Sequence, residues 1–283
     1  MSIKSVISFT LALVLLASAV SFAGDSEQDI INKYLAKTEK AHVQKIGWLS
    51  FHYQYNRVNR GSDYNQMAST LSTQISGTDF QWIGNTNAFG LEFGTVFKQN
   101  FAWTIGGEFW SKAGTSYSGT FTYTPPSGIP TTVVDPKSEV SVWGITTGMQ
   151  YYIKNAPQPG SALTKLALRT GLTAGYYVAT WDLFDQYQNL NLSTATPESE
   201  NIAYKGNSVG LSLNVGAEYP IKLWDMTLGM DANYLYLNFG NVAWYNVQDE
   251  EIVATWNGEE DGRVDLDMSG FRGKVELKRY FSW

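Results

Sequence analysis

The feature that most constrains the fold is an alternation of apolar with small or polar residues that recurs along the chain from residue 46 onward. In the segment 208–219, every odd-numbered residue is apolar and every even-numbered residue is glycine, serine, asparagine or glutamate. The same period is present in 87–97 and in 165–180. Because successive side chains of a strand point to opposite faces, each segment is predicted to be a β-strand between two different environments.

Eight such segments are predicted, and the connections between them alternate in length. The segments are 46–57, 86–97, 101–112, 139–153, 165–180, 205–219, 225–238 and 266–283. The short connections are 98–100, 154–164 and 220–224, and the long, polar ones are 58–85, 113–138, 181–204 and 239–265. Short turns at one end and long loops at the other are typical of an outer-membrane barrel, whose turns face the periplasm. We therefore expect an all-β fold, an eight-stranded antiparallel transmembrane β-barrel over 46–283, with the N- and C-termini in the periplasm.

Two further segments precede the predicted barrel. Residues 1–23 have the features of a cleaved secretory signal peptide: Lys4 supplies the positive charge, the following stretch is almost entirely apolar, and the small residues Ser21 and Ala23 stand at the expected cleavage site. An uncleaved membrane anchor is the alternative. Residues 24–45 favour a helix, with acidic residues early and lysines late, which suits the helix dipole. We expect a short N-terminal helix that forms a periplasmic tether, with a partner-binding or oligomerising helix as the alternative.

Composition excludes several classes of protein. Only 16% of the residues are charged, yet after the first two dozen residues no uncharged apolar run approaches the roughly 18 residues that a membrane helix needs. A helical membrane protein is therefore excluded. The absence of cysteine excludes disulfides, thiolate metal sites and a cysteine nucleophile, and two histidines argue against a histidine-built metal centre. A net charge of -6 argues against nucleic acid as a partner.

The two faces of the predicted strands differ in a way that indicates which one contacts lipid. Aromatic residues gather at the strand ends, as in the two interfacial girdles of a membrane barrel, so the apolar face is expected outside. A secreted soluble sandwich is the alternative. The other face then lines a narrow lumen, which large side chains such as Trp48 and Tyr152 are expected to close. Because alternate residues of a strand share a face, nine charged residues are expected to point into this lumen, where acidic and basic side chains nearly balance and form a network: Glu92, Glu108, Arg169, Glu218, Asp231, Arg272, Lys274, Glu276 and Lys278.

The sequence of the last predicted strand resembles a signal found in a known family of proteins. Its sequence, FRGKVELKRYFSW, ends on an aromatic residue and resembles the C-terminal β-signal of bacterial outer-membrane proteins, carried here by Val275, Leu277, Phe281 and Trp283. Arg279 interrupts this apolar face and is expected to reach the lipid headgroups. At the level of pattern, 46–283 resembles the small OmpA/OmpX/OmpW-type barrels. The resemblance implies a place in the bacterial cell outer membrane, contact with outer-membrane lipid and lipopolysaccharide, and recognition of the last strand by the barrel-assembly machinery.

No motif assigns a reaction to the chain. His52 is a lone residue of the predicted lumen, and no established catalytic or nucleotide-binding pattern is present. We therefore expect no enzyme activity, no catalytic residues, no cofactor and no metal site. The acidic segment 249–261 is interpreted as a solvated loop, with divalent-cation binding as the alternative, and 117–134 is expected to form a hairpin that prolongs the barrel.

Three function classes remain. The expected one is a non-enzymatic structural or surface-interaction role, carried by the four long extracellular loops, with an unknown external ligand. The alternatives are a narrow conduit for small solutes, including apolar ones, and a lipid-modifying enzyme. An eight-stranded interior is just wide enough for side chains to fill, which argues against a general porin.

Overall fold

The computed structural model describes residues 45–59, 63–98, 100–124, 130–157, 163, 165–184, 186–189, 202–221, 226–245, 251–252 and 264–282. The predicted signal peptide, the predicted tether apart from Lys45, Trp283 and most of the acidic segment 249–261 lie outside these residues. No helix among the described residues is long and apolar enough to span a membrane.

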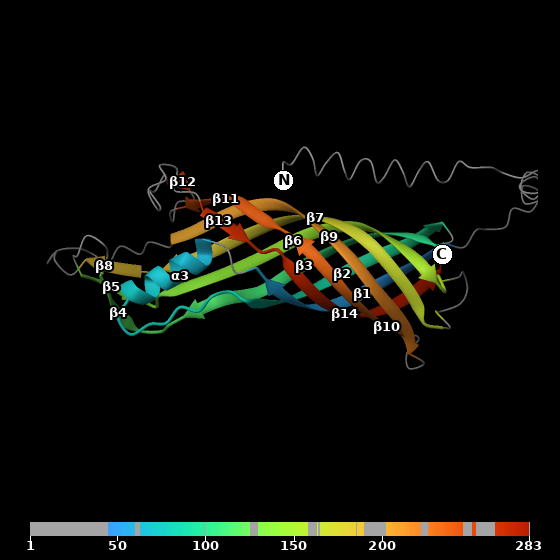
Figure 1. Cartoon of the computed structure of the whole chain (residues 1–283), viewed down its shortest axis with the longest axis horizontal. Helices are drawn as coiled ribbons and strands as arrows, with labels where there is room; N and C mark the ends of the chain where they lie inside the picture. Colours follow the sequence, from blue (N-terminus) through green and yellow to red (C-terminus); the bar gives the residue numbers. More distant parts are fainter. Residues whose placement is uncertain are drawn as a thin grey trace, which may run out of the picture. The chain divides into compact units, whose positions relative to one another are not determined.

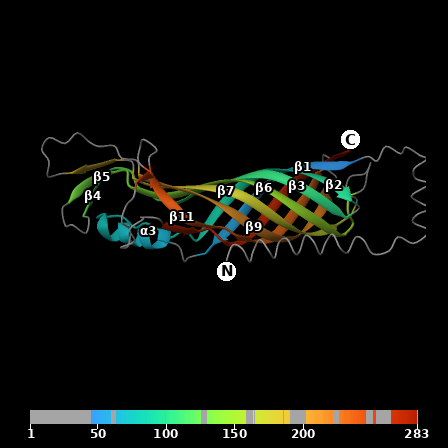
Figure 2. The ribbon, with the colours of Figure 1, turned by 90° about the horizontal axis from the view of Figure 1, so that it is seen from above.

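Eight strands close into an antiparallel barrel (Figure 1). They are β1 (Ile46–Val58), β2 (Asn85–Lys98), β3 (Phe101–Ser116), β6 (Lys137–Lys154), β7 (Ala167–Phe184), β9 (Ile202–Ile221), β10 (Met226–Tyr236) and β14 (Gly270–Ser282). Each strand pairs with the next in this order, and β14 pairs with β1 to close the barrel. The strands wind obliquely around the barrel (Figure 2). The predicted fold class is therefore confirmed.

The apolar face of the strands is the outer face. On β1, Phe51 lies opposite Leu91 of β2 on one side and Leu277 of β14 on the other. These three side chains are 50%, 58% and 40% exposed. Such a surface is costly in water and is stable in contact with hydrocarbon. The barrel is thus built as a membrane-spanning one, with its small and polar residues turned inward.

Two of the predicted strands are interrupted in the structure. The segments 225–238 and 266–283 were each expected to be continuous, but the structure breaks them at Leu237 and at Met268–Ser269. The Ser269 hydroxyl accepts a hydrogen bond from the Leu237 backbone N–H and donates one to its carbonyl, which also accepts from the Met268 backbone N–H at 2.9 Å. A side chain therefore replaces the backbone acceptor of the Leu237 N–H. Asp267 then accepts from the Ser269 backbone N–H. This local competition ends the ladder.

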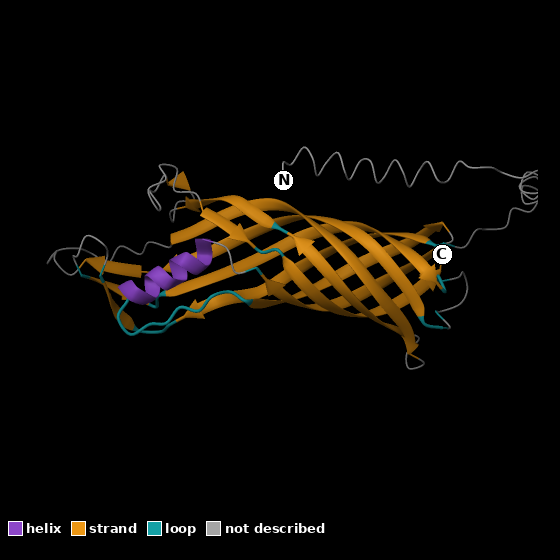
Figure 3. Ribbon diagram, in the orientation of Figure 1, coloured by secondary structure: helices purple, strands orange, loops and turns teal. Residues whose placement is uncertain are grey.

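The long connections contain secondary structure of their own, at the end of the barrel that we call the loop end (Figure 3). It comprises α3 (Asp63–Gln74), β4 (Thr120–Tyr123), β5 (Thr131–Val134), β8 (Gln186–Asn189), β11 (Asn238–Tyr245), β12 (Glu251–Ile252) and β13 (Val264–Asp267). β4 and β5 form the expected hairpin in the second loop, and β5 also pairs with β8 from the third. The opposite end, where β1 begins and the short connections lie, is the turn end.

The helix α3 was not predicted, because its residues have low helix propensity. Several of its serine and threonine hydroxyls, such as Ser69 and Ser72, bond the carbonyl four residues earlier, a competition that weakens isolated helices. Burial stabilises it instead: Tyr64, Ala68 and Leu71 lie on one face at helical spacing and pack into the mouth of the barrel. Tertiary packing therefore overrides propensity here.

Candidate functional site: a buried charge network in the barrel

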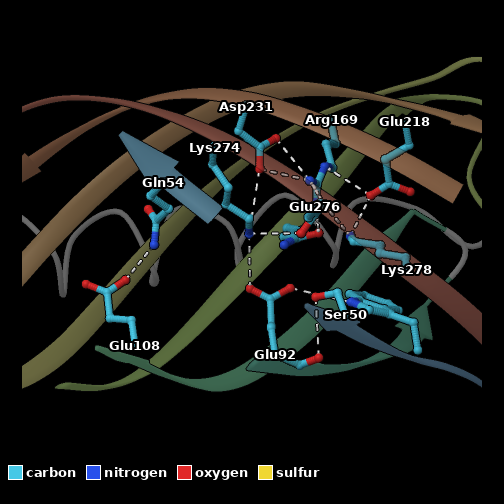
Figure 4. A network of polar contacts seen from close by, with 12 residues as sticks. Ser50, Gln54, Glu92, Glu108, Arg169, Glu218, Asp231, Lys274, Glu276 and Lys278 are labelled. Atoms are coloured by element: carbon cyan, nitrogen blue, oxygen red, sulfur yellow. Dashed lines mark hydrogen bonds and ion pairs between the residues drawn. The ribbon is translucent and has the colours of Figure 1, made fainter. Parts of the chain in front are cut away.

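The interior of the barrel has three successive layers. At the loop end, α3 and inward-facing side chains such as Trp110, Trp181 and Phe239 form an apolar cluster. At the turn end, Trp48 and Tyr152 belong to a second apolar cluster. Charged and polar side chains occupy the space between the two clusters. Figure 4 shows the contacts that these polar side chains make with one another.

Strand periodicity places the charged residues of this middle layer. Four of them are every second residue of β14, and each is buried: Arg272, Lys274, Glu276 and Lys278. The other five come one each from β2, β3, β7, β9 and β10, as Glu92, Glu108, Arg169, Glu218 and Asp231. The structure thus places all nine sequence-predicted lumenal residues inside the barrel and brings them into contact with one another, with Glu92 the least buried.

Arg169 is the centre of the network and is only 1% exposed. Its Nε lies 3.0 Å from Glu218 Oε1, and its Nη2 lies 2.9 Å from Asp231 Oδ2. Nη2 also forms an ion pair with Glu276, while Nη1 donates to Gln150 Oε1 at 2.8 Å. One guanidinium therefore joins three carboxylates from three different strands, a use that its fixed fork of donors suits.

The two lysines of β14 complete this part of the network. Lys274 Nζ lies 3.0 Å from Glu276 Oε2, 3.6 Å from Glu92 Oε2 and 3.7 Å from Asp231 Oδ2. Lys278 Nζ lies 2.6 Å from Glu218 Oε1 and 3.1 Å from Glu276 Oε1. Three carboxylates contacting Arg169 are thus matched by three cations.

A second group lies nearer the loop end. Arg272 Nη2 donates to Glu108 Oε1 at 3.1 Å, and Gln54 Nε2 donates to Glu108 Oε2 at 2.8 Å. The indole N–H of Trp110 donates to the same carboxylate at 2.9 Å, and the Arg272 guanidinium stacks 4.6 Å from the centre of the Trp110 ring. Glu108 is therefore neutralised and hydrogen-bonded on both oxygens.

Neutral partners of the charges were not predicted from the sequence. Tyr152 and Tyr280 both donate to Glu218, and Lys278 lies 4.6 Å from the centre of the Trp48 ring. Parity indicates that such residues face inward, but it does not indicate which ones meet. Glycines on neighbouring strands make room for the charges: a Cβ at Gly216 would lie 1.7 Å from Asp231 Oδ1.

The histidine of the lumen remains apart from this network. His52 is buried, and neither ring nitrogen has a hydrogen-bond partner among the described residues. In the described part of the chain, no three or more His, Cys, Asp or Glu side chains are arranged so that they could hold a metal ion. What the arrangement does chemically is to neutralise charge and crosslink strands, because each carboxylate is held by cations or donors from other strands.

The residues of the predicted β-signal lie on the opposite face of β14. Val275, Leu277 and Phe281 point outward and are exposed, whereas Trp283 lies outside the described residues. Arg279 shares this outer face. The last strand of the barrel thus presents apolar side chains outside and four charges inside.

Comparison with known proteins finds similarity in structure only. No protein-family model matches the sequence, and no curated protein matches it. Among solved structures, OprG from Pseudomonas aeruginosa is 13% identical, with 83% of this chain and 95% of that chain covered at a TM-score of 0.43. Ail from Yersinia pestis, solved with the heparin analogue sucrose octasulfate, is 14% identical over 84% and 99% of the two chains at a TM-score of 0.34. Neisserial surface protein A is 11% identical over 85% and 97% at 0.36. These are small outer-membrane barrels, and this chain shares their fold.

Proposed function

We propose that the chain is a non-enzymatic barrel of the bacterial outer membrane, with a structural or surface-interaction role carried by its long loops. The observation that carries this proposal is the contrast between the two ends of the described chain. The lumen is filled by two apolar clusters with a charge network between them. The loop end, in contrast, is built into an ordered surface. A partner is therefore expected to meet the loops rather than the lumen.

The ordered surface at the loop end joins segments from three loops. Val133 of β5 lies opposite Tyr187 of β8. The backbone N–H of Thr124, just after β4, donates to the carbonyl of Gln74 at the end of α3 at 2.8 Å. Ordering long loops costs conformational entropy, about 1–2 kcal/mol for each residue fixed, which packing must offset. A surface held in one conformation suits recognition, since less ordering remains to be done on binding.

The charge of this surface indicates a class of partner. Among the described side chains outside the lumen, the loop end carries seven acidic residues, namely Asp63, Asp79, Asp135, Glu139, Asp182, Asp265 and Asp267. It carries four basic ones, namely Arg57, Lys112, Lys137 and Lys205. A basic protein surface fits this excess directly, and lipopolysaccharide phosphates fit it when divalent cations bridge the two.

The proposal includes an export route and an orientation. Residues 1–23 are removed as a signal peptide, 24–45 form a periplasmic tether, and the outward residues of the last strand are read by the barrel-assembly machinery. Short turns face the periplasm in such barrels. A cysteine introduced at Gly128 or Glu259 should react with an impermeant maleimide on intact cells, whereas one at Gln99 should not. Labelling at Gln99 in intact cells would contradict the orientation.

The role of the loops is tested by removing the hairpin β4–β5. Gly119 and Asp135 close its base, since the Gly119 N–H donates to Asp135 Oδ1 at 2.6 Å and the Asp135 N–H to the Gly119 carbonyl at 2.8 Å. Residues 120–134 can therefore be replaced by two glycines without changing β3 or β6. Because 120–134 contains no acidic residue, a second variant, Asp79→Asn/Asp135→Asn/Asp182→Asn/Asp265→Asn, removes charge from the same surface. We expect heat-modifiable mobility on gels to persist in both variants, while binding of poly-lysine, and of lipopolysaccharide with Mg²⁺, falls at least several-fold in the asparagine variant. Unchanged binding to both probes would refute the assignment of function to this surface.

The two alternatives have their own tests. A conduit requires an open path through the middle layer of the lumen. Because charged and polar side chains occupy this layer, the purified barrel should show no large, stable conductance in planar bilayers. A reproducible channel of porin size would place the conduit first. A lipid-modifying enzyme requires turnover, so the barrel reconstituted in phospholipid vesicles should release no fatty acid above the level of empty vesicles. Release that is lost in His52→Ala would establish the enzyme instead.

A further inference from the structure

The charges outside the lumen are distributed unequally between the two ends of the barrel. All seven acidic side chains of this set lie at the loop end. Five cations lie at the turn end, namely Lys45, Lys98, Lys154, Lys165 and Arg279, and each is exposed. Within the described residues, none of these five makes an ion pair. The described part of the turn end therefore carries uncompensated positive charge.

These cations border the apolar outer surface. Lys98 follows the exposed Phe97, Lys154 follows the exposed Ile153, and Lys165 precedes the exposed Leu166. Arg279 projects from the outer face of β14, between Leu277 and Phe281. A long cationic side chain at the edge of an apolar belt places its stem along hydrocarbon and its charge among lipid headgroups.

The cations also extend around the barrel rather than forming one patch. Arg279 is on β14, Lys45 precedes β1, Lys98 ends β2, Lys154 ends β6 and Lys165 precedes β7. These strands and β3 are consecutive around the barrel. A protein partner would cover one side, whereas a lipid leaflet surrounds the whole circumference. The distribution therefore favours a lipid surface.

We propose that this ring of cations at the turn end binds the phosphate groups of anionic phospholipids in the leaflet that surrounds it. The inference rests on the proposed membrane location and adds the lipid class that this end of the barrel selects. Phosphate oxygens supply the counter-charge that the described acidic residues do not supply there. The loop end, with its acidic excess, has no such preference.

The test compares two variants that remove the same charge from opposite ends. The first is Lys98→Gln/Lys154→Gln/Lys165→Gln/Arg279→Gln. The matched control is Lys112→Gln/Lys137→Gln/Lys205→Gln/Arg57→Gln, which also removes three lysines and one arginine. Each protein is folded in detergent micelles with dioleoyl phosphatidylglycerol or dioleoyl phosphatidylcholine, and bound lipid is counted by native mass spectrometry.

We expect the wild type to retain phosphatidylglycerol in preference to phosphatidylcholine and to lose this preference in high salt. The turn-end variant should bind phosphatidylglycerol at least tenfold more weakly, because each basic residue near an anionic surface contributes about fivefold. The loop-end control should stay within about twofold of wild type on the same basis. Equal losses in the two variants, or no loss in the turn-end variant, would overturn the inference.

Two further measurements keep the result interpretable. The charge-conserving variant Lys98→Arg/Lys154→Arg/Lys165→Arg/Arg279→Lys should retain phosphatidylglycerol, so a folding defect in the glutamine variant does not imitate a lost lipid site. Failure of that variant to bind would also count against the inference. Insertion of the wild type into pure phosphatidylcholine vesicles is the separate test of the membrane location. Insertion without any preference for phosphatidylglycerol would overturn only the proposal that the ring of cations binds anionic phospholipids. Failure to insert would overturn the proposed function.

Discussion

Replacing Arg169 by methionine tests whether the charge network holds the barrel together. The substitution removes a guanidinium that contacts Glu218, Asp231 and Glu276, and it retains most of the volume of the side chain. Lys274 and Lys278 remain, so three buried carboxylates are left with two cations. Breaking a buried ion pair from one side typically costs about 3–5 kcal/mol, because a desolvated charge loses its partner.

The matched surface substitution is Lys112→Ala. Lys112 pairs with Glu139 at 3.3 Å, but the two side chains are 59% and 19% exposed. Such a pair contributes about 0–1 kcal/mol, since water and salt screen it. The free energy of unfolding of each variant can be measured by urea titration of the barrel in phospholipid vesicles, followed by tryptophan fluorescence. The structure predicts a difference of about 2–5 kcal/mol between the two variants.

A double substitution separates lost pairing from lost packing. Glu276→Gln removes one of the carboxylates that Arg169 neutralises, so Arg169→Met/Glu276→Gln restores the balance of charge. The double variant should be destabilised by less than the sum of the two single variants, with a coupling of about 0.5–3 kcal/mol. A cost under about 1 kcal/mol for Arg169→Met, or strictly additive costs, would show that the network does not stabilise the fold.

Two other substitutions follow from the packing of the barrel and its loops. Gly94→Val should lower the free energy of unfolding by about 1–3 kcal/mol, because a Cβ there would lie 2.1 Å from the Trp48 ring. Gly273→Val should change the free energy of unfolding little, because nothing lies within 4 Å of a Cβ added there. Equal urea midpoints for the two variants would contradict this difference. Burial raises the pKa of Tyr64 in α3 to about 12 while its hydroxyl donates to the Ser138 carbonyl at 2.8 Å. Since the folded pKa lies above the unfolded value of 10, the stability that Tyr64 gives is complete below pH 10 and is lost as the pH rises towards 12. Protease sensitivity of the first loop should therefore rise over this pH interval in the wild type. An identical rise in Tyr64→Phe would show that ionisation of Tyr64 is not the cause.

Most of the fold is predictable from the sequence, because one physical rule governs it. Alternation with period two both identifies a strand and assigns its faces, so the eight segments and their order follow from reading the chain. The predicted ends are less accurate toward the loops, where β3, β7 and β9 continue beyond them. There the strands leave the membrane, and the contrast between the two faces fades.

The contacts within the site are much less predictable. Parity assigns a side to Arg169 and to Glu276, but these residues are 107 positions apart, and only the closed barrel determines that they meet. The same holds for Gln54 and Glu108, which register and the winding of the strands bring together. The helix α3 was missed for a related reason, because its stability comes from the barrel mouth rather than from its own residues.

The position of the charges along the chain has a consequence for how the barrel closes. Before β14 joins, the lumenal residues of the other strands are four acids and one base, since Arg169 alone faces Glu92, Glu108, Glu218 and Asp231. The final strand brings three bases and one acid, a net charge of +2 against -3. Insertion of β14 between β10 and β1 therefore brings opposite charge to the acidic lumenal residues of the other strands and leaves a net lumenal charge of -1. A last strand without Arg272, Lys274 and Lys278 would leave Arg169 as the one basic residue among the acidic ones of the described lumen.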